Sequence, residues 1–190
     1  MKNPLNPDLS PAGSCIVMDA VAINKAIRRI AHEIVEQHPS AANVVLAGIP
    51  TRGTEIARRL ADHIEQIEGR RPYLGSVDVS MHRDDLATRS RITTLQETNL
   101  PMDLDGRPLV LVDDVFFTGR TCRAALDAIT SFGRPSTIRL AVLIDRGHRE
   151  LPIRADYVGK NLPTSLNEKI RVRLEPLDGI PDSVSIVTAP

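Results

Sequence analysis

The sequence predicts an α/β protein built on a mostly parallel β-sheet with helices packed against it. Segments with strand patterns alternate along the chain with segments of helical periodicity, which is typical of parallel α/β folds. Two strand segments, Val44–Ala47 and Leu109–Val112, are continuous apolar runs of the kind found in strands buried on both faces. With 190 residues, 42% of them hydrophobic and 25% charged, the chain can bury a sizeable core.

The first predicted helix follows a lead-in without periodicity. Residues 1–14 contain three prolines and are interpreted as this lead-in, and residues 15–190 as one domain. A helix is predicted over residues 19–37, where the Asp19 carboxylate can accept from first-turn amides. One apolar stripe along it consists of Ile23, Ile27, Ile30 and Ile34. We expect this stripe to face the core.

A second helix, a strand and a long patternless segment follow the strand at Val44. The helix is predicted over residues 54–68, and its buried face is Ile56, Leu60, Ile64 and Ile67. Alternating polar and apolar residues predict a strand over residues 76–81. Residues 82–108 lack a sustained pattern, and connections of this length are often functional lids or β-arms.

The second half of the chain continues the alternation. A helix is predicted over residues 120–132, with Ala124, Ala125, Ala128, Ile129 and Phe132 facing inward. Gly133 is expected to end it in a left-handed conformation. A strand is predicted over residues 138–144, and weaker strand patterns occupy residues 157–158, 170–174 and 184–187.

Composition excludes several classes of protein. Lys plus Arg and Asp plus Glu each number 24, so no net positive charge argues for nucleic-acid binding. Two cysteines cannot form a disulfide scaffold and suit a reducing cytoplasm. No apolar run is long enough to span a membrane, and no secretory leader is evident. The histidines lack the spacing of a zinc site, so no metal site built from protein ligands alone is expected.

The segment Leu109–Thr121 carries the clearest chemistry. It runs from an apolar strand through Asp113 and Asp114 to a Thr-Gly-Arg-Thr turn that opens a helix. Free amides at a helix start hold phosphate well, and a glycine lets the backbone approach the anion. Adjacent carboxylates accept hydrogen bonds from hydroxyls, so the pair suits a sugar beyond that phosphate. The alternative is a plain strand–turn–helix connection with Asp and Thr caps.

A second loop, Ala47–Gly53, also lies between a predicted strand and a helix. Gly48 and Gly53 bracket a tight turn, and Arg52 can grip a diphosphate with its planar fork. The alternative is an ordinary loop with a surface arginine.

Residues 109–121 closely resemble the phosphoribosyl-pyrophosphate (PRPP) motif of type I phosphoribosyltransferases. The resemblance implies that family's fold, with a small hood and a long lid or β-arm at about residues 82–108. It implies that Asp113 and Asp114 hold the ribose hydroxyls and that the turn holds the 5′-phosphate. The predicted turn and wall residues are Val115, Phe116, Phe117, Thr118, Gly119, Arg120 and Thr121. Thr51 and Arg52 match the family's diphosphate loop, which often contains a cis peptide bond.

Further segments are similar to the PyrR family, whose resemblance extends with gaps from about Asp19 to Leu174. The matching segments are residues 29–33, 83–86, 133–136 and 145–161. The resemblance implies a bifunctional protein that binds pyr mRNA in response to uridine nucleotides such as UMP and UTP, and that makes UMP and diphosphate from uracil and PRPP. It implies Mg²⁺, held mainly by the PRPP diphosphate, and a homodimer or homotetramer.

Further residues are expected near the substrate from their place in the chain. Arg83 and Asp84 lie near the predicted lid hinge, and Arg146 follows the strand at residues 138–144. The strand near residues 170–173 is a candidate for reading uracil. The chain departs from the family's common pattern at His82, at Phe116-Phe117 and at Leu166-Asn167, and the last departure reduces the local positive charge.

Two basic stretches form the predicted RNA surface. The helix over residues 19–37 carries Lys25, Arg28, Arg29 and His32 opposite its apolar stripe, and the second stretch is His148, Arg149, Arg154 and Lys160. Read alone, these stretches are better explained as a solvated face balanced by nearby acids, and only the family resemblance favours RNA. Two other functions stay open: an RNA-binding nucleotide sensor with negligible catalysis, and a phosphoribosyltransferase for another base without an RNA role.

Overall fold

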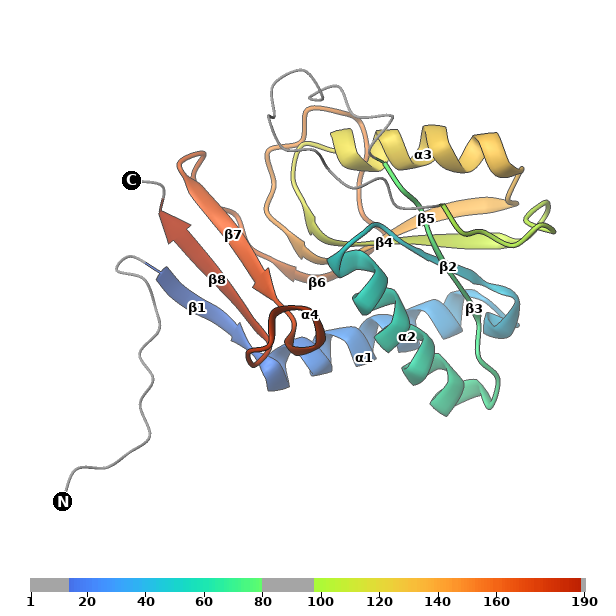
Figure 1. Ribbon diagram of the computed structural model, residues 1–190, viewed down its shortest axis with the longest axis horizontal. Helices are drawn as coiled ribbons and strands as arrows, with labels where there is room; N and C mark the ends of the chain where they lie inside the picture. The colour runs from blue at the N-terminus through green and yellow to red at the C-terminus, as the bar shows by residue number, and fades with distance from the viewer. Residues whose placement is uncertain (1–13, 80–97, 189–190) are drawn as a thin grey trace.

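The central layer is a five-stranded parallel sheet in the order β3-β2-β4-β5-β6. The computed structural model describes residues 14–79 and 98–188. Its strands are β2 (Val45–Gly48), β3 (Tyr73–Ser76), β4 (Pro108–Phe116), β5 (Thr137–Asp145) and β6 (Tyr157–Asn161). Helices α1 (Ala20–Gln37) and α2 (Arg52–Glu68) cover one face, and α3 (Arg120–Phe132) covers the other (Figure 1). The predicted α/β class is therefore confirmed.

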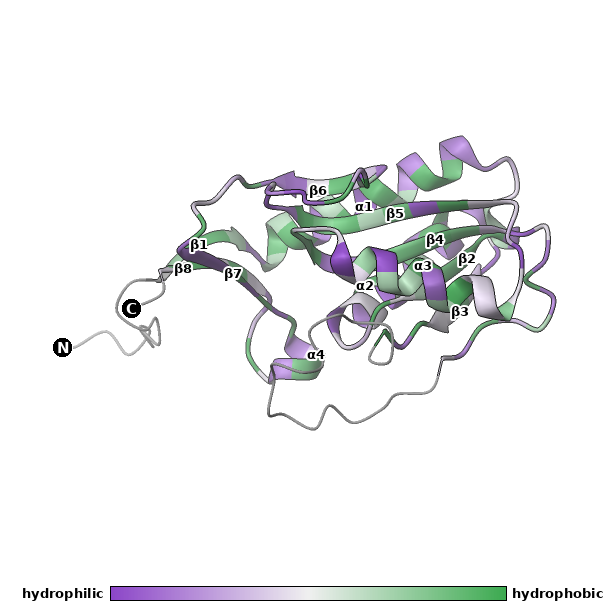
Figure 2. Ribbon diagram, turned by 90° about the horizontal axis from the view of Figure 1, so that it is seen from above, coloured by the Kyte–Doolittle hydropathy of each residue, from purple (hydrophilic) through white to green (hydrophobic). Residues whose placement is uncertain are grey.

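Alternating side chains of the central strands feed two separate cores. Val110 and Val112 of β4 pack with α1 and α2, whereas Leu109 and Leu111 of the same strand pack with α3. Residues that alternate along a strand point to opposite faces, so one apolar run serves both layers. Figure 2 shows these strands as a hydrophobic band between helices whose outer turns are polar.

A second, smaller sheet lies beside the first and is called the hood. It is antiparallel in the order β1-β8-β7, with β1 (Ser14–Asp19), β7 (Glu168–Arg173) and β8 (Ser183–Thr188). The one-turn helix α4 (Glu175–Asp178) connects β7 to β8. The hood is a separate sheet, and the chain joins it to the rest of the fold at the start of α1 and through the segment between β6 and β7 (Figure 1). A short 3-10 turn, η1 (Ala41–Asn43), precedes β2.

The predicted helices agree closely with the structure. Asp19 caps α1 by accepting from the Ala22 amide at 2.8 Å, and the isoleucine stripe of α1 is buried. On α2 the outermost predicted core residue, Ile67, is 37% exposed, and on α3 Phe132 is 53% exposed. The inward assignment of both residues was wrong: each lies in the last turn of its helix and is exposed.

Two further local predictions were wrong. The strand predicted over residues 76–81 is β3 at Tyr73–Ser76, because parallel pairing with β2 ends at the Gly48–Ser76 pair. Val77 and Val79 stay buried beyond this ladder, which explains the alternation in the sequence. Gly133 has φ 169°, an extended rather than left-handed value. A Cβ there would meet Asp105 Oδ1 at 2.9 Å, so close approach explains this glycine.

The N-terminal strand β1 was not predicted, and it begins at Ser14, the last residue of the interpreted lead-in. Residues 1–13 lie outside the described residues, as does most of the predicted lid over residues 82–108, including Arg83 and Asp84. From the described end of that segment, Asn99 forms an antiparallel bridge with Ser76. No helix in the described ranges is long and apolar enough to cross a membrane.

Candidate active site

The predicted diphosphate loop and ribose acids lie at the carboxyl ends of two neighbouring strands, β2 and β4. The chain proceeds from β2 outward to β3, and from β4 in the other direction to β5 and β6. The strand order therefore reverses between β2 and β4. Open α/β sheets bind ligands at the carboxyl ends of strands beside such a switch point. The topology thus brings the two motifs to one site.

Two glycines allow close packing of the loop after β2, Gly53 against β4 and Gly48 against the start of α2. A Cβ on Gly53 would lie 2.4 Å from the Val112 carbonyl oxygen, and one on Gly48 would lie 2.4 Å from Thr54 Cα. The Ile49 amide donates to the Val112 carbonyl at 2.8 Å. The loop is therefore anchored at the residue that precedes Asp113. The Pro50–Thr51 peptide bond is cis, as the resemblance to the family's diphosphate loop implied.

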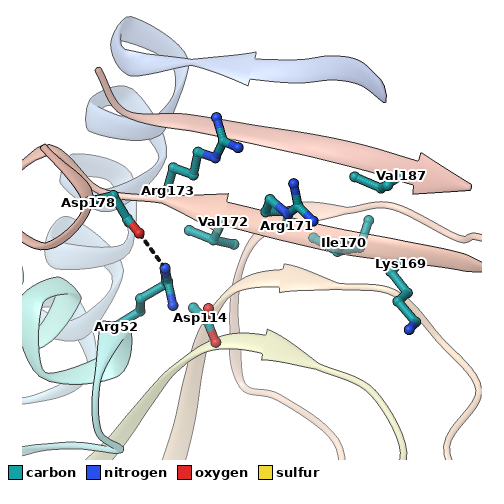
Figure 3. Close-up of a pocket in the computed structure, with 9 residues that line it drawn as sticks. All are labelled: Arg52, Asp114, Lys169, Ile170, Arg171, Val172, Arg173, Asp178 and Val187. Atoms are coloured by element: carbon teal, nitrogen blue, oxygen red, sulfur yellow. Dashed lines mark hydrogen bonds and ion pairs between the residues drawn. The ribbon is translucent and has the colours of Figure 1, made fainter. Parts of the chain in front are cut away.

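Arg52 and Asp114 line one pocket of about 500 Å³ between the sheet and the hood. The other lining residues come from the hood: Lys169, Ile170, Arg171, Val172, Arg173, Asp178 and Val187. Figure 3 shows Ile170 and Val172 on the side of β7 that faces Asp114, with Arg171 and Arg173 directed away. The strand predicted to read uracil therefore forms one wall of this pocket, with apolar side chains toward the acids.

The electrostatics of the acid pair depend on burial. Burial raises the pKa of the Asp114 carboxyl, while Asp113 and the charge of Arg52 oppose the rise. Asp113 Oδ1 accepts from the Asp114 amide at 2.8 Å, and Asp114 Oδ1 accepts from the Val115 amide at 2.9 Å. These bonds orient the carboxylates at the end of β4 and leave Asp114 bordering the pocket.

The predicted phosphate turn has the expected backbone geometry. Gly119 has φ +92° and immediately precedes α3, so the first amides of that helix lie at the turn. Arg120 Nε donates to Glu150 at 2.8 Å, and the Glu150 amide donates to the Thr118 carbonyl at 3.0 Å. The segment after β5 thus packs against the phosphate turn. Thr121 is in the first turn of α3.

Arg146 lies beside this site, where its guanidinium forms hydrogen bonds and contacts an aromatic ring. Its guanidinium donates to Thr164 Oγ1 at 3.0 Å and to the Glu168 carbonyl at 2.9 Å, and it stacks on the Phe117 ring at 3.9 Å. Burial lowers its pKa. Arg146 therefore connects the wall of the predicted site to the residues that enter β7. It is not among the residues that line the pocket with Arg52 and Asp114.

The two predicted RNA stretches come together around β6, an edge strand of the parallel sheet. Arg29 Nη2 donates to the carbonyls of Val158 and Gly159, both at 2.8 Å. Lys160 Nζ donates to the Val17 carbonyl at 3.1 Å. A shallow groove of about 380 Å³ runs between them and is lined by Met18, Ala22, Lys25, Ala26, Arg29, Gly159 and Lys160.

The remaining predicted RNA residues are all exposed, and two of them, His148 and Arg149, also contact other parts of the protein. His148 Nε2 lies 2.5 Å from the Thr164 carbonyl oxygen, and its ring packs edge-on against Phe117. Arg149 donates to the buried Asp145 carboxylate at 2.5 Å. Arg28, His32 and Arg154 are exposed. His148 and Arg149 therefore border the predicted substrate site as well as the surface.

The pattern of the sequence did not reveal Asp178. Its carboxylate accepts from Arg52 Nη2 at 2.6 Å (Figure 3). The two residues are 126 positions apart, and neither the Leu-Asp-Gly context nor the spacing distinguishes Asp178 from other surface acids. Within the described ranges, no three His, Cys, Asp or Glu side chains are grouped so that they could hold a metal ion.

Comparison with known proteins identifies the family. The phosphoribosyl transferase domain family matches residues 17–175. A Bifunctional protein PyrR from a Roseiflexus species is 54% identical over 171 residues, covering 90% of this chain and 93% of that protein. The Bifunctional protein PyrR of Streptomyces coelicolor is 58% identical over 164 residues, covering 86% of this chain and 84% of the relative. This chain belongs to the PyrR family.

Solved structures confirm the fold of the PyrR chain independently. A hypoxanthine-guanine phosphoribosyltransferase from Bacillus anthracis superposes with a TM-score of 0.69 at 16% identity, covering 91% of this chain and 97% of that one. A hypoxanthine phosphoribosyltransferase from Trypanosoma cruzi in complex with IMP gives 0.69 at 15%, covering 95% and 93%. The predicted type I phosphoribosyltransferase fold and membership of the PyrR family are both confirmed.

Proposed function

We propose that this PyrR protein converts uracil and PRPP to UMP and diphosphate at the pocket between β4 and the hood, and that it regulates pyrimidine biosynthesis genes by uridine-nucleotide-dependent binding of pyr mRNA. The observation that supports the catalytic part is the convergence of Arg52 and Asp114 on one pocket at the switch point of the sheet. A cytoplasmic location and a homodimeric or homotetrameric state belong to the same proposal.

The proposed roles follow from the chemistry of each element. A uracil nitrogen displaces diphosphate from C1 of PRPP, and the transition state has oxocarbenium character. Arg52 neutralises charge on the leaving diphosphate, which lowers the barrier because that charge grows during the reaction. Asp113 and Asp114 accept from the ribose hydroxyls. The amides and hydroxyls of residues 118–121 hold the 5′-phosphate.

The residues of this site fit a Mg²⁺ ion that is bound mainly by the diphosphate. Members of the phosphoribosyltransferase family generally use Mg²⁺ with PRPP. Mg²⁺ keeps several waters and is usually bound through one or two carboxylates plus substrate phosphates. Asp114 supplies a carboxylate at the pocket without belonging to a closed set of protein ligands among the described residues. When bound, the ion would neutralise diphosphate charge.

The base is proposed to lie against Ile170 and Val172 of β7. Their side chains face the acids across the pocket, so they offer an apolar surface beside the position proposed for the ribose (Figure 3). Backbone amides and carbonyls of the hood would then read the uracil edge. This arrangement is typical of ligand sites, which combine apolar lining with a few placed polar groups.

Product formation from PRPP and Mg²⁺ tests the catalytic part, with uracil, hypoxanthine, adenine and orotate assayed in parallel. UMP from uracil alone is the expected result. Arg52→Ala should lower kcat/KM strongly, whereas Arg70→Ala, which changes an exposed arginine after α2, should leave it unchanged. No product with any base from a folded protein that binds UMP would favour the nucleotide sensor instead.

RNA binding is tested on the groove and on the segment after β5. Lys25→Ala and a His148→Ala/Arg149→Ala double variant are expected to weaken UMP-dependent binding of a pyr leader RNA, because phosphate contacts contribute much of the affinity. Binding should also fall steeply with salt, and Arg70→Ala again serves as the control. Unchanged RNA affinity in all these variants would contradict the RNA surface.

A further inference from the structure

The ion pair between Arg52 and Asp178 joins the proposed diphosphate loop to the hood. The Nη2–Oδ1 distance is 2.6 Å, and both side chains are largely covered, with 34% and 22% exposure. Arg52 Nε is buried and has no hydrogen-bond partner among the described residues. The guanidinium therefore contacts Asp178 through Nη2, and the buried Nε is left without an acceptor from the described part of the chain.

Apart from Arg52, Asp178 is held by its own turn, where its amide donates to the Leu174 carbonyl at 2.9 Å. Its second oxygen accepts from the Leu174 amide at 2.8 Å, which closes the single turn of α4. None of the four residues of α4 is buried. By contrast, Val172 and Val184 in the adjoining strands belong to the main apolar core. Residues 175–178 can thus move without exposing core side chains, while the buried N-cap residue Leu174 and strands β7 and β8 stay packed.

A second ion pair fixes the far side of the same segment. Arg59, two turns after Arg52 on α2, contacts Asp182 just before β8, with an Nη2–Oδ1 distance of 3.1 Å. Asp182 also accepts from the Glu175 amide at 2.8 Å. Burial acts to raise the Asp182 pKa, but these hydrogen bonds outweigh it and the pKa is lowered. The segment is therefore attached to α2 at two points, one of which is the proposed ligand-binding arginine.

We propose that Asp178 is a resident competitor of the diphosphate: it holds Arg52 in the unliganded site, and the incoming diphosphate displaces it. This rests on the proposed function. A carboxylate and a diphosphate oxygen both bind the guanidinium fork, and they repel each other at contact distance. Exchange frees the α4 turn, while Arg59 and Asp182 keep the base of the hood attached. Asp178 is a positioning residue in this scheme.

The test is equilibrium binding of inorganic diphosphate, measured by calorimetry with and without Mg²⁺. In metal-free buffer Asp178→Asn should bind diphosphate about threefold to tenfold more tightly than the parent protein, because the competing charge is gone while an amide oxygen remains. Asp182→Asn is the matched control and should leave this affinity unchanged. Thermal unfolding of each variant verifies that it is folded.

Other outcomes would overturn the proposal. Unchanged or weaker metal-free binding by Asp178→Asn would show that Asp178 does not compete. Weaker binding only in the presence of Mg²⁺ would show that it acts through the metal instead. Parent-like binding by Arg52→Ala would refute the role of Arg52 as well. Absence of UMP formation alongside tighter diphosphate binding by Asp178→Asn would refute the proposed reaction and leave the exchange standing.

Discussion

The contact between Gly53 and Val112 offers a demanding test of how the site is assembled. Gly53 lies in the first turn of α2, where alanine would ordinarily stabilise the helix by about 0.5 to 1 kcal/mol. Its Cβ would, however, lie 2.4 Å from the Val112 carbonyl and 3.2 Å from Asp113 Cα. An ordinary contact needs about 1 Å more. Gly53→Ala must therefore push the loop carrying Arg52 away from β4.

The expected magnitude follows from that displacement. Forcing an extra methyl into a packed position costs about 1 to 3 kcal/mol of stability. A misplacement of about 1 Å in a catalytic group can cost about 100-fold in rate. We therefore expect Gly53→Ala to unfold at lower urea concentration and to lose about two orders of magnitude in kcat/KM for UMP formation.

The matched control changes a glycine at the other end of the same helix. Gly69 has φ +70° and open space around its Cα, so Gly69→Ala should cost about 1 kcal/mol of stability through backbone strain without moving the site. Its kcat/KM should stay near that of the parent. A Gly53→Ala variant that is more stable than the parent and fully active would refute the packing argument.

Three further predictions concern ionisation. Hydrogen bonds from Arg58 and then Arg59 lower the pKa of the buried Glu55 carboxyl. The stabilisation from its charge is therefore present above the ordinary glutamate pKa and is lost as pH falls through the folded-state pKa. Urea unfolding should show that Glu55→Gln costs about 1.5 to 3 kcal/mol at pH 7 and less in acid. Burial raises the pKa of the Asp114 carboxyl, so its ionisation destabilises the fold as pH rises above the ordinary aspartate pKa. Asp114→Asn should therefore be more stable than the parent at pH 7 and equally stable in strong acid. The same variant should have low activity. Burial raises the pKa of the Cys122 thiol to about 12. Iodoacetamide at pH 8 should therefore modify the exposed Cys15 and leave Cys122 unmodified until urea is added. Mass spectrometry of the alkylated protein measures this difference.

The sequence was informative where the signal is local. The isoleucine stripe of α1 and the apolar runs of β2 and β4 obey short periodicities, so the elements were placed within a few residues. The loop at Gly48–Gly53 and the acids at Asp113 and Asp114 each occupy a few consecutive positions. The chemistry of these residues can be inferred from their types and spacing, without knowing which distant residues they contact.

The hood was less predictable because its order depends on distant pairing. β1 pairs with β8 about 170 positions later, and Cys15 and Ile16 are exposed, so β1 carries little of the amphipathic pattern that identifies a strand. No feature of the sequence distinguishes Asp178 from the other acidic residues, and only the folded structure places it beside Arg52. The same holds for Arg146, whose contacts with Thr164 and Glu168 show a connecting position that its place after a strand could not reveal.

The two walls of the pocket are held by different kinds of interaction, and this difference bears on their motion. The wall on the parallel sheet depends on close-packed backbone contacts, such as that of Gly53 with Val112. The hood wall is anchored by apolar strands, but its α4 turn is fixed to α2 chiefly through Arg52 and Arg59. Close-packed contacts resist displacement, whereas an ion pair can exchange one anion for another at little net cost. Adjustment to ligand should therefore be confined to the α4 turn, with the acids on β4 remaining in place.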